Sequence, residues 1–248
     1  MKILVPLKQV PDLVEELEVD DSGTQLDFEY LKMKLNEFDD HALEEALLIK
    51  ESGDAEVTAI AIDGEDVERI LFTALAKGAD KAVRITGADP RADSRTLGAI
   101  FAEAAKSLGA DLVLTGVQAP GDLDGQLGPA MAAAMDVPGI SVVASVEPSG
   151  GVVVLQKEYS GGMMAEFEVE LPAVVGVQAA RQAPRYAPVS KVRQIQQSAT
   201  IEEMAATSSQ GGKAGKVVRM EPPSRGQGAK MLAGAAEIVE ILKEKGVV

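Results

Sequence analysis

Residues 110–129 carry the residue types best suited to holding a ligand. Leu112-Val113-Leu114 is a short apolar run, typical of a strand buried on both faces of a parallel sheet, and Gly116 ends it. After a loop, Pro129 lies in the first turn of a helix-forming run rich in Ala and Met. The backbone N–H groups of residues 125–128 should then be free, and such groups bind phosphate at a helix N-terminus.

Two carboxylates in this loop, Asp122 and Asp124, admit opposite interpretations. They would repel a phosphate placed beside them, yet a carboxylate a few residues away accepts hydrogen bonds from ribose hydroxyls. A glycine-rich surface loop without a ligand explains the spacing equally well. The loop by itself leaves both interpretations open.

Composition excludes several classes of function. The chain has no Cys and one His, His41, which excludes a disulfide framework, a thiolate or histidine metal cluster and a cysteine nucleophile. A formal net charge of -15 argues against binding nucleic acid or an anionic membrane. No carboxylate pair stands beside a nucleophile, so we expect a protein without catalytic residues of its own.

Phosphate-binding motifs of the known types are absent or incomplete. No Gly-x-Gly-x-x-Gly follows the first expected strand, where Pro6 and Pro11 occupy the turn. Residues 208–216 resemble a P-loop only loosely, because Gln210 and Val217 replace two of its defining residues. Ser160-Gly161-Gly162 lies where a hairpin turn is expected, so we interpret it as a turn.

The elements that must position the loop alternate along the chain. Strands are expected at residues 2–7, 56–62, 81–85 and 112–114, each followed by a helical pattern, with apolar stripes at 38–49, 67–75, 97–108 and 129–136. Asn36 is expected to cap the first of these helices, with Asp39 three residues on in a box-like position. This order predicts an α/β fold: an open, mainly parallel, doubly wound sheet with helices on both faces.

The regular alternation of strands and helices ends in the second half of the chain. A fifth strand is expected at 140–146, a β-hairpin over 152–171 and a buried strand at 173–177, while residues 17–30 suggest a separate small hairpin. We therefore divide the chain into an α/β nucleotide-binding domain (1–184), a recognition loop with an extended arm (185–230) and a C-terminal helix (231–248). Within the polar arm we expect at most a short helix at 201–204.

The first strand begins almost at Met1, and no apolar run approaches the length that spans a membrane. We therefore expect no cleavable leader, no direct membrane insertion and a cytoplasmic location.

Several segments together resemble the β (small) subunit of electron-transfer flavoproteins over essentially the whole chain. Their order and spacing carry the resemblance more than any single one of them. They are Val5-Pro6-Leu7-Lys8-Gln9-Val10, Leu35-Asn36-Glu37-Phe38-Asp39-Asp40, Ala74-Leu75-Ala76-Lys77-Gly78-Ala79-Asp80, Gly116-Val117-Gln118, Leu171-Pro172-Ala173-Val174-Val175 and Pro184-Arg185-Tyr186-Ala187.

The resemblance implies a heterodimer in which an α subunit holds FAD and this subunit buries an AMP of structural role. Phe38 would also lie near the flavin with Leu13, where relatives often have an aromatic residue, and Tyr186 and Val189 would belong to the loop that recognises dehydrogenases. By position the AMP-binding residues would be Pro6, Asn36, Glu37, Phe38, Asp39, Ile62, Gly116, Val117, Gln118, Ala119, Pro120, Gly121, Asp122, Leu123, Asp124, Gly125, Gln126, Leu127 and Gly128.

Alternatives remain open within and beyond this resemblance. Some relatives bifurcate electrons and hold a second FAD where others hold AMP; their loop carries a Thr that residues 120–129 lack, which favours AMP. Residues 35–40 instead look like the subgroup that serves trimethylamine-type dehydrogenases. A stand-alone adenine-nucleotide regulator of the universal-stress type shares the strand-loop-helix logic, but it would not need a long polar extension after residue 185.

Overall fold

The computed structural model describes residues 1–122, 125–207, 217–223, 226 and 228–248. It contains two compact units. One comprises Met1–Glu16 with Glu29–Lys216, and the other comprises Leu17–Phe28 with Val217–Val248. The predicted candidate site lies within the first unit, apart from Leu123 and Asp124, which fall outside the described residues.

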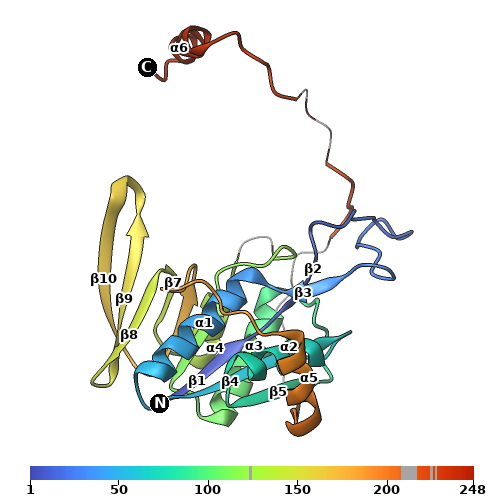
Figure 1. Ribbon diagram of the computed structural model, residues 1–248, viewed down its shortest axis with the longest axis vertical. Coiled ribbons are helices and arrows are strands. Elements are labelled where there is room, and N and C mark those ends of the chain that lie inside the picture. The colour runs from blue at the N-terminus through green and yellow to red at the C-terminus, as the bar shows by residue number, and fades with distance from the viewer. Residues whose placement is uncertain (123–124, 208–216, 224–225, 227) are drawn as a thin grey trace. The chain divides into compact units, whose positions relative to one another are not determined.

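The first unit is built on a seven-stranded sheet in the order β12-β5-β4-β1-β6-β11-β7 (Figure 1). Every neighbouring pair in it is parallel, as the buried, Val-rich strands predict. In sheet order the strands are Glu202–Ala205, Lys81–Thr86, Glu56–Ile62, Lys2–Pro6, Leu112–Gly116, Ala173–Val177 and Gly139–Val143.

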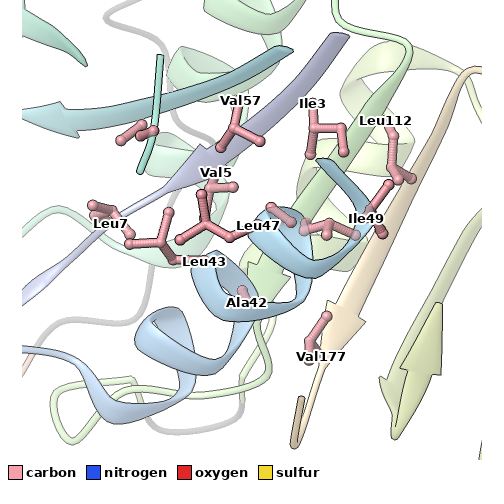
Figure 2. Packing of buried hydrophobic residues seen from close by; sticks show 14 of the residues in the cluster. Ile3, Val5, Leu7, Ala42, Leu43, Leu47, Ile49, Val57, Leu112 and Val177 are labelled. Atoms are coloured by element: carbon pink, nitrogen blue, oxygen red, sulfur yellow. The ribbon is translucent and has the colours of Figure 1, made fainter. Parts of the chain in front are cut away.

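Helices cover both faces of this sheet, which confirms the predicted α/β class. On one face Val5 of β1 packs in one apolar cluster with Leu43 of α1 (Figure 2). Leu71 of α2 belongs to the same cluster. On the other face Leu4 shares a cluster with Phe101 of α3 and Met131 of α4. These helices are α1 (Glu37–Ser52), α2 (Val67–Lys77), α3 (Ser94–Leu108) and α4 (Leu127–Met135).

The chain reverses its direction of travel across the sheet beside β1. From β1 it runs through α1 to β4 and through α2 to β5, moving toward one edge, and then returns through α3 to β6 on the other side of β1. The short antiparallel pair β2 (Gln9–Pro11) and β3 (Met33–Leu35) lies between β1 and α1 in the chain. Ligands of open α/β sheets bind at such a reversal, beyond the carboxyl ends of the strands.

The predicted fifth strand is two strands that belong to different sheets. β7 ends at Val143 in the main sheet, and β8 (Ser145–Ser149) joins β9 (Val152–Tyr159) and β10 (Met163–Glu170) in an antiparallel sheet. Val142 has φ of 67°, which is rare for a β-branched residue, and the pairing of β11 with β7 shifts register there. The expected hairpin turn is present, because Gly161 and Gly162 both have positive φ.

The prediction of an extended arm from residue 185 was wrong for residues 189–205. Helix α5 (Val189–Ser198) packs against α2, and the segment expected to be a short helix is instead strand β12, paired with β5 at the sheet edge. Arg84 of β5 makes an ion pair with Glu203 of β12. Polar composition hid this strand because an edge strand buries little of its surface; Met204 is only half-buried.

The second unit contains the small hairpin and the end of the chain. Val19 pairs with Leu26 across the hairpin, and the N–H of Met220 donates to the carbonyl of Gly23 at 2.7 Å. The C-terminal helix, α6, spans Ala235–Glu244. That the segment 185–230 wraps a partner subunit stays a prediction.

Candidate functional site

A pocket lies at the carboxyl ends of β1 and β4, at the reversal point of the sheet. Its space amounts to about 390 Å³ including the open mouth. The structure brings four predicted site residues together around it from four segments of the chain: Pro6, Asp39, Ile62 and Leu127. Leu97 and Phe101 of α3 and Pro90 add further apolar surface.

Asn36 and Asp39 connect the start of α1 to the neighbouring loops rather than capping the helix with their side chains. Asn36 lies at the N-cap position without a capping hydrogen bond, so the predicted capping box was wrong. Its Nδ2 donates instead to the carbonyl of Gln118 at 2.9 Å, and the N–H of Lys8 donates to Asp39 Oδ2 at 2.8 Å. The first turn of α1 thereby holds the segments after β1 and β6 in place.

Asp39 is buried, and its ionisation is correspondingly perturbed. Loss of hydration raises the pKa of its carboxyl from 3.8 to about 7, although hydrogen bonds from Asn36 and from the backbone of Lys8 and Gly116 oppose the shift. The two predicted neighbours in this turn differ in exposure, Glu37 being exposed and Phe38 half-buried.

Glycines let the loop after β6 approach its surroundings closely. A Cβ at Gly116 would collide with the Asp39 Oδ1 and lie 2.8 Å from both the Asp39 nitrogen and the Phe38 carbonyl carbon, so the backbone of β6 lies directly against the first turn of α1. Gly125 has φ of 62°, and a Cβ on it would collide with the Val117 carbonyl. These two contacts explain why the predicted loop needs glycine at both positions.

The start of α4 offers backbone donors as predicted. Because α4 begins at Leu127, the first N–H groups of the helix have no partner within it, and Gln126 at the N-cap adds no side-chain hydrogen bond among the described residues. Below it, the Thr115 hydroxyl is fully buried without a hydrogen-bond partner in the described part of the chain. A Cβ on Gly128 would lie 2.8 Å from that hydroxyl.

The remaining loop residues lie in varied environments. Asp122 is buried and accepts a hydrogen bond from the Ser94 hydroxyl at the start of α3, and its N–H donates to the Ala119 carbonyl at 2.9 Å. Pro120 and Gly121 are exposed. The predictions for Leu123 and Asp124 lie outside the described residues.

Of the predicted site residues that the structure describes, only Pro6, Asp39, Ile62 and Leu127 line this pocket. The three residues predicted for other contacts, Leu13, Tyr186 and Val189, do not line it either. Leu13, expected near the flavin, is 57% exposed. Tyr186 and Val189 are 80% and 59% exposed, but Val189 is the first residue of α5 rather than part of a loop, with Pro188 at the N-cap. A proline that cannot donate fits that place, and it directs Val189 into the first helical turn.

Comparison with known proteins gives the family. Residues 24–209 match the electron transfer flavoprotein domain. The chain belongs to the electron transfer flavoprotein family, and within it to the β-subunit group.

Curated relatives extend this match over the whole chain. A protein of Methylophilus methylotrophus named electron transfer flavoprotein subunit beta is 36% identical over 98% of both chains. The mitochondrial subunit beta of Arabidopsis thaliana is 31% identical over 99% of this chain and 98% of its own. One of Clostridium acetobutylicum with the same name is 35% identical over 77% of this chain and 74% of its own. The stand-alone regulator considered from the sequence is thereby set aside.

Some pocket residues of this flavoprotein chain were missed by sequence reasoning. Leu97 and Phe101 were assigned to the core, because a helical apolar stripe does not distinguish core from pocket wall. For Gln9, the one signal in the sequence that could have marked it as a pocket residue is its position just after the first strand. Its Nε2 is buried and has no hydrogen-bond partner among the described residues, although the residue lines the pocket.

These observations test whether the residues fit the nucleotide that the family implies. Buried polar atoms are almost always hydrogen-bonded, so the unpartnered Gln9 amide and Thr115 hydroxyl point to a polar group that the chain itself does not supply. The apolar walls suit a base, and the start of α4 suits a phosphate. The residues fit an adenine nucleotide.

Two further features of the described residues bear on other functions. No helix there is long and apolar enough to cross a bilayer. Nor does that part of the chain contain a group of three or more side chains arranged to hold a metal ion.

Proposed function

We propose that this chain is the β subunit of a heterodimeric electron-transfer flavoprotein and binds AMP in the pocket beyond β1. The observation that carries the proposal is the meeting of Pro6, Asp39, Ile62 and Leu127, from four separate segments, around one pocket at the reversal point of the sheet. The family resemblance of the sequence assigns each of these four residues to a nucleotide site.

The residues present assign parts of AMP to parts of the pocket. The free N–H groups at the start of α4 would hold the phosphate, and the apolar walls with the Gln9 amide would hold the base. Asn36 and Asp39 keep the two loops together around it. AMP has a structural role in this proposal and takes no part in the redox chemistry.

We further propose that the subunit is an electron carrier rather than an enzyme. An α subunit would hold most of the FAD, which supplies the electron-carrying chemistry when bound, and Phe38 and Leu13 would lie near it. Electrons would come from dehydrogenases, of which the trimethylamine type is our first candidate, and pass to a downstream acceptor. Tyr186 and Val189 are exposed apolar side chains suited to the docking contact.

Identification of the released nucleotide tests the pocket assignment. The β subunit is purified alone, denatured, and the supernatant analysed by mass spectrometry. We expect about one AMP per chain and a colourless protein, because the start of α4 offers donors for one phosphate. Stoichiometric FAD would instead favour the electron-bifurcating alternative, and absence of any nucleotide would contradict the proposal.

Substitution of Val189 by Ala tests the docking surface. Loss of two methyl groups should cost about 1–2 kcal/mol of binding to the dehydrogenase if the receiving pocket is well packed. Folding and AMP content should not change, because Val189 is exposed. The measurements are electron transfer at subsaturating flavoprotein and the melting temperature; an unchanged rate, or a large fall in melting temperature, contradicts the role.

A further inference from the structure

The chain crosses helix α1 on its way from one side of the sheet to the other. β11 lies next to the β7 edge, whereas β12 forms the opposite edge. Residues 178–188, here called the strap, begin this crossing, and Figure 1 shows the chain passing α1 between β11 and α5. The Gln178 N–H donates to the carbonyl of Val143 in β7 at 2.9 Å, and residues 179–188 belong to no strand of the described structure, so other groups must fix their course.

Two neighbouring glutamates of α1 hold the strap at two points. Glu45 is fully buried and accepts hydrogen bonds from the N–H of Arg181 at 3.0 Å and its Nε at 2.8 Å. Glu44 is 3% exposed and accepts from the N–H of Arg185 at 2.9 Å and from Nε and Nη2 at 3.0 and 2.8 Å. Glu51, exposed on the same helix, receives a third contact from Arg185 at 2.5 Å.

The interaction of Arg185 with Glu44 is stronger than a surface ion pair. Its guanidinium forms a two-pronged contact with a buried carboxylate, and its own N–H completes the set, so both backbone and side chain are fixed. Immediately beyond lie Tyr186 and Val189, which are exposed and make no part of the core. Two exposed side chains with large apolar surface thus lie close in sequence to a fixed anchor.

We infer that Glu44 is a positioning residue for docking: by fixing Arg185 it holds Tyr186 and Val189 in the arrangement that a donor dehydrogenase meets. This inference rests on the proposed docking role of those two side chains. Preorganisation lowers the cost of ordering a contact segment on binding. Loss of the anchor should therefore weaken docking without changing the electron-transfer step that follows.

Trypsin gives a test that needs no dehydrogenase. The heterodimer is digested briefly, and cuts after Arg181 and Arg185 are quantified for wild type, Glu44→Gln and Glu45→Gln. Each glutamate controls for the other, since they are adjacent, buried and paired with one arginine each. We expect Glu44→Gln to accelerate the cut after Arg185 by roughly tenfold, leaving the cut after Arg181 unchanged, because local opening exposes only the freed arginine. Equal acceleration of both cuts, or of neither, overturns the inference.

Kinetics then separates positioning from folding. With trimethylamine dehydrogenase as donor, Glu44→Gln should raise the apparent KM for the heterodimer by about 3- to 10-fold at unchanged kcat. In a Val189→Ala background it should add little, because both act through one contact. An unchanged KM, or full additivity, contradicts the inference. If Val189→Ala alone has no effect, the docking proposal fails, while the tryptic pattern still decides whether Glu44 anchors the strap.

Discussion

The start and the middle of helix α1 both bury carboxylates, but the groups that contact the carboxylates differ between the two places. Asp39 in the first turn accepts hydrogen bonds from neutral donors, the Asn36 amide and the Lys8 N–H, and the charge of Lys8 acts on it only through space. Glu44 and Glu45 in the middle each meet an arginine. A carboxylate held by neutral donors retains a desolvation cost when ionised, whereas a guanidinium offsets that cost by attraction.

The difference separates two roles for one helix. The start of α1 is sensitive to protonation and lies against the pocket, whereas its middle is a permanent anchor for the strap. Hydrogen bonds to Glu44 and Glu51 also raise the pKa of Arg185 above its already high value, so this guanidinium stays charged at any ordinary pH. We therefore expect variants at the two places to differ in kind, and the following experiments test that expectation.

Removal of a buried anchor should have the largest effect. Glu45→Ala leaves the Val146 and Arg181 N–H groups and the Arg181 guanidinium without their acceptor. Breaking a buried pair in this way costs about 3–5 kcal/mol of unfolding free energy. The measurement is urea unfolding with Glu51→Ala as control, since that exposed pair should contribute at most about 1 kcal/mol. Similar losses for both would show that burial does not matter.

Filling the contact between α1 and β6 should come next. Gly116→Ala places a methyl group against the backbone of Phe38 and Asp39, which cannot move aside as a flexible side chain would. We expect a loss of about 2–3 kcal/mol and a loss of bound AMP. Gly53→Ala is the control, because a Cβ there would meet, among the described residues, only the Ile49 carbonyl oxygen at 4.0 Å. Retention of AMP at full stoichiometry would mean that the pocket does not need this contact.

The buried Asp39 should make the free energy of unfolding depend on pH. The unfolded chain releases this proton near pH 3.8 and the folded chain near pH 7, so between these values the folded state binds more protons. The free energy of unfolding therefore falls as pH rises through that window and levels off above it, by on the order of 1–4 kcal/mol.

Asp39→Asn should remove this dependence. Relative to wild type the variant should become more stable as pH rises from about 5 to 8, as measured by melting temperature. A constant difference across that range would contradict the raised pKa. Glu44→Gln serves as the comparison, since it alters a buried carboxylate of the same helix that is paired with an arginine.

The Gln9 amide should have the smallest and most specific effect. Gln9→Leu removes a donor that has no partner within the described chain, so stability without nucleotide should change little. AMP affinity should fall by about 1–2 kcal/mol, roughly 5- to 30-fold, if the amide contacts the base. Equilibrium dialysis with AMP measures it, with Gln156→Leu, at an exposed glutamine of β9, as the control. Unchanged affinity would place the base elsewhere.

The sequence by itself determined the alternation of strands and helices and the loop that carries the site. Runs such as Leu112-Val113-Leu114 and the stripe containing Leu43 and Leu47 report burial directly, and glycines such as Gly125 mark where the backbone must turn or approach closely. These are local signals, because apolar spacing and backbone freedom depend on nearby residues.

Only the tertiary structure decided which polar groups meet. Asn36 satisfies its amide on Gln118, 82 residues away, rather than on its own helix, and Glu44 meets Arg185 across 141 residues. The polar segment of β12 became a strand because β5 offered an unpaired edge. Periodicity shows which face of a helix or strand is apolar. It carries no information about the distant partner of a carboxylate, an amide or a strand edge, because many groups along the chain could serve as that partner and only the fold brings one of them into place.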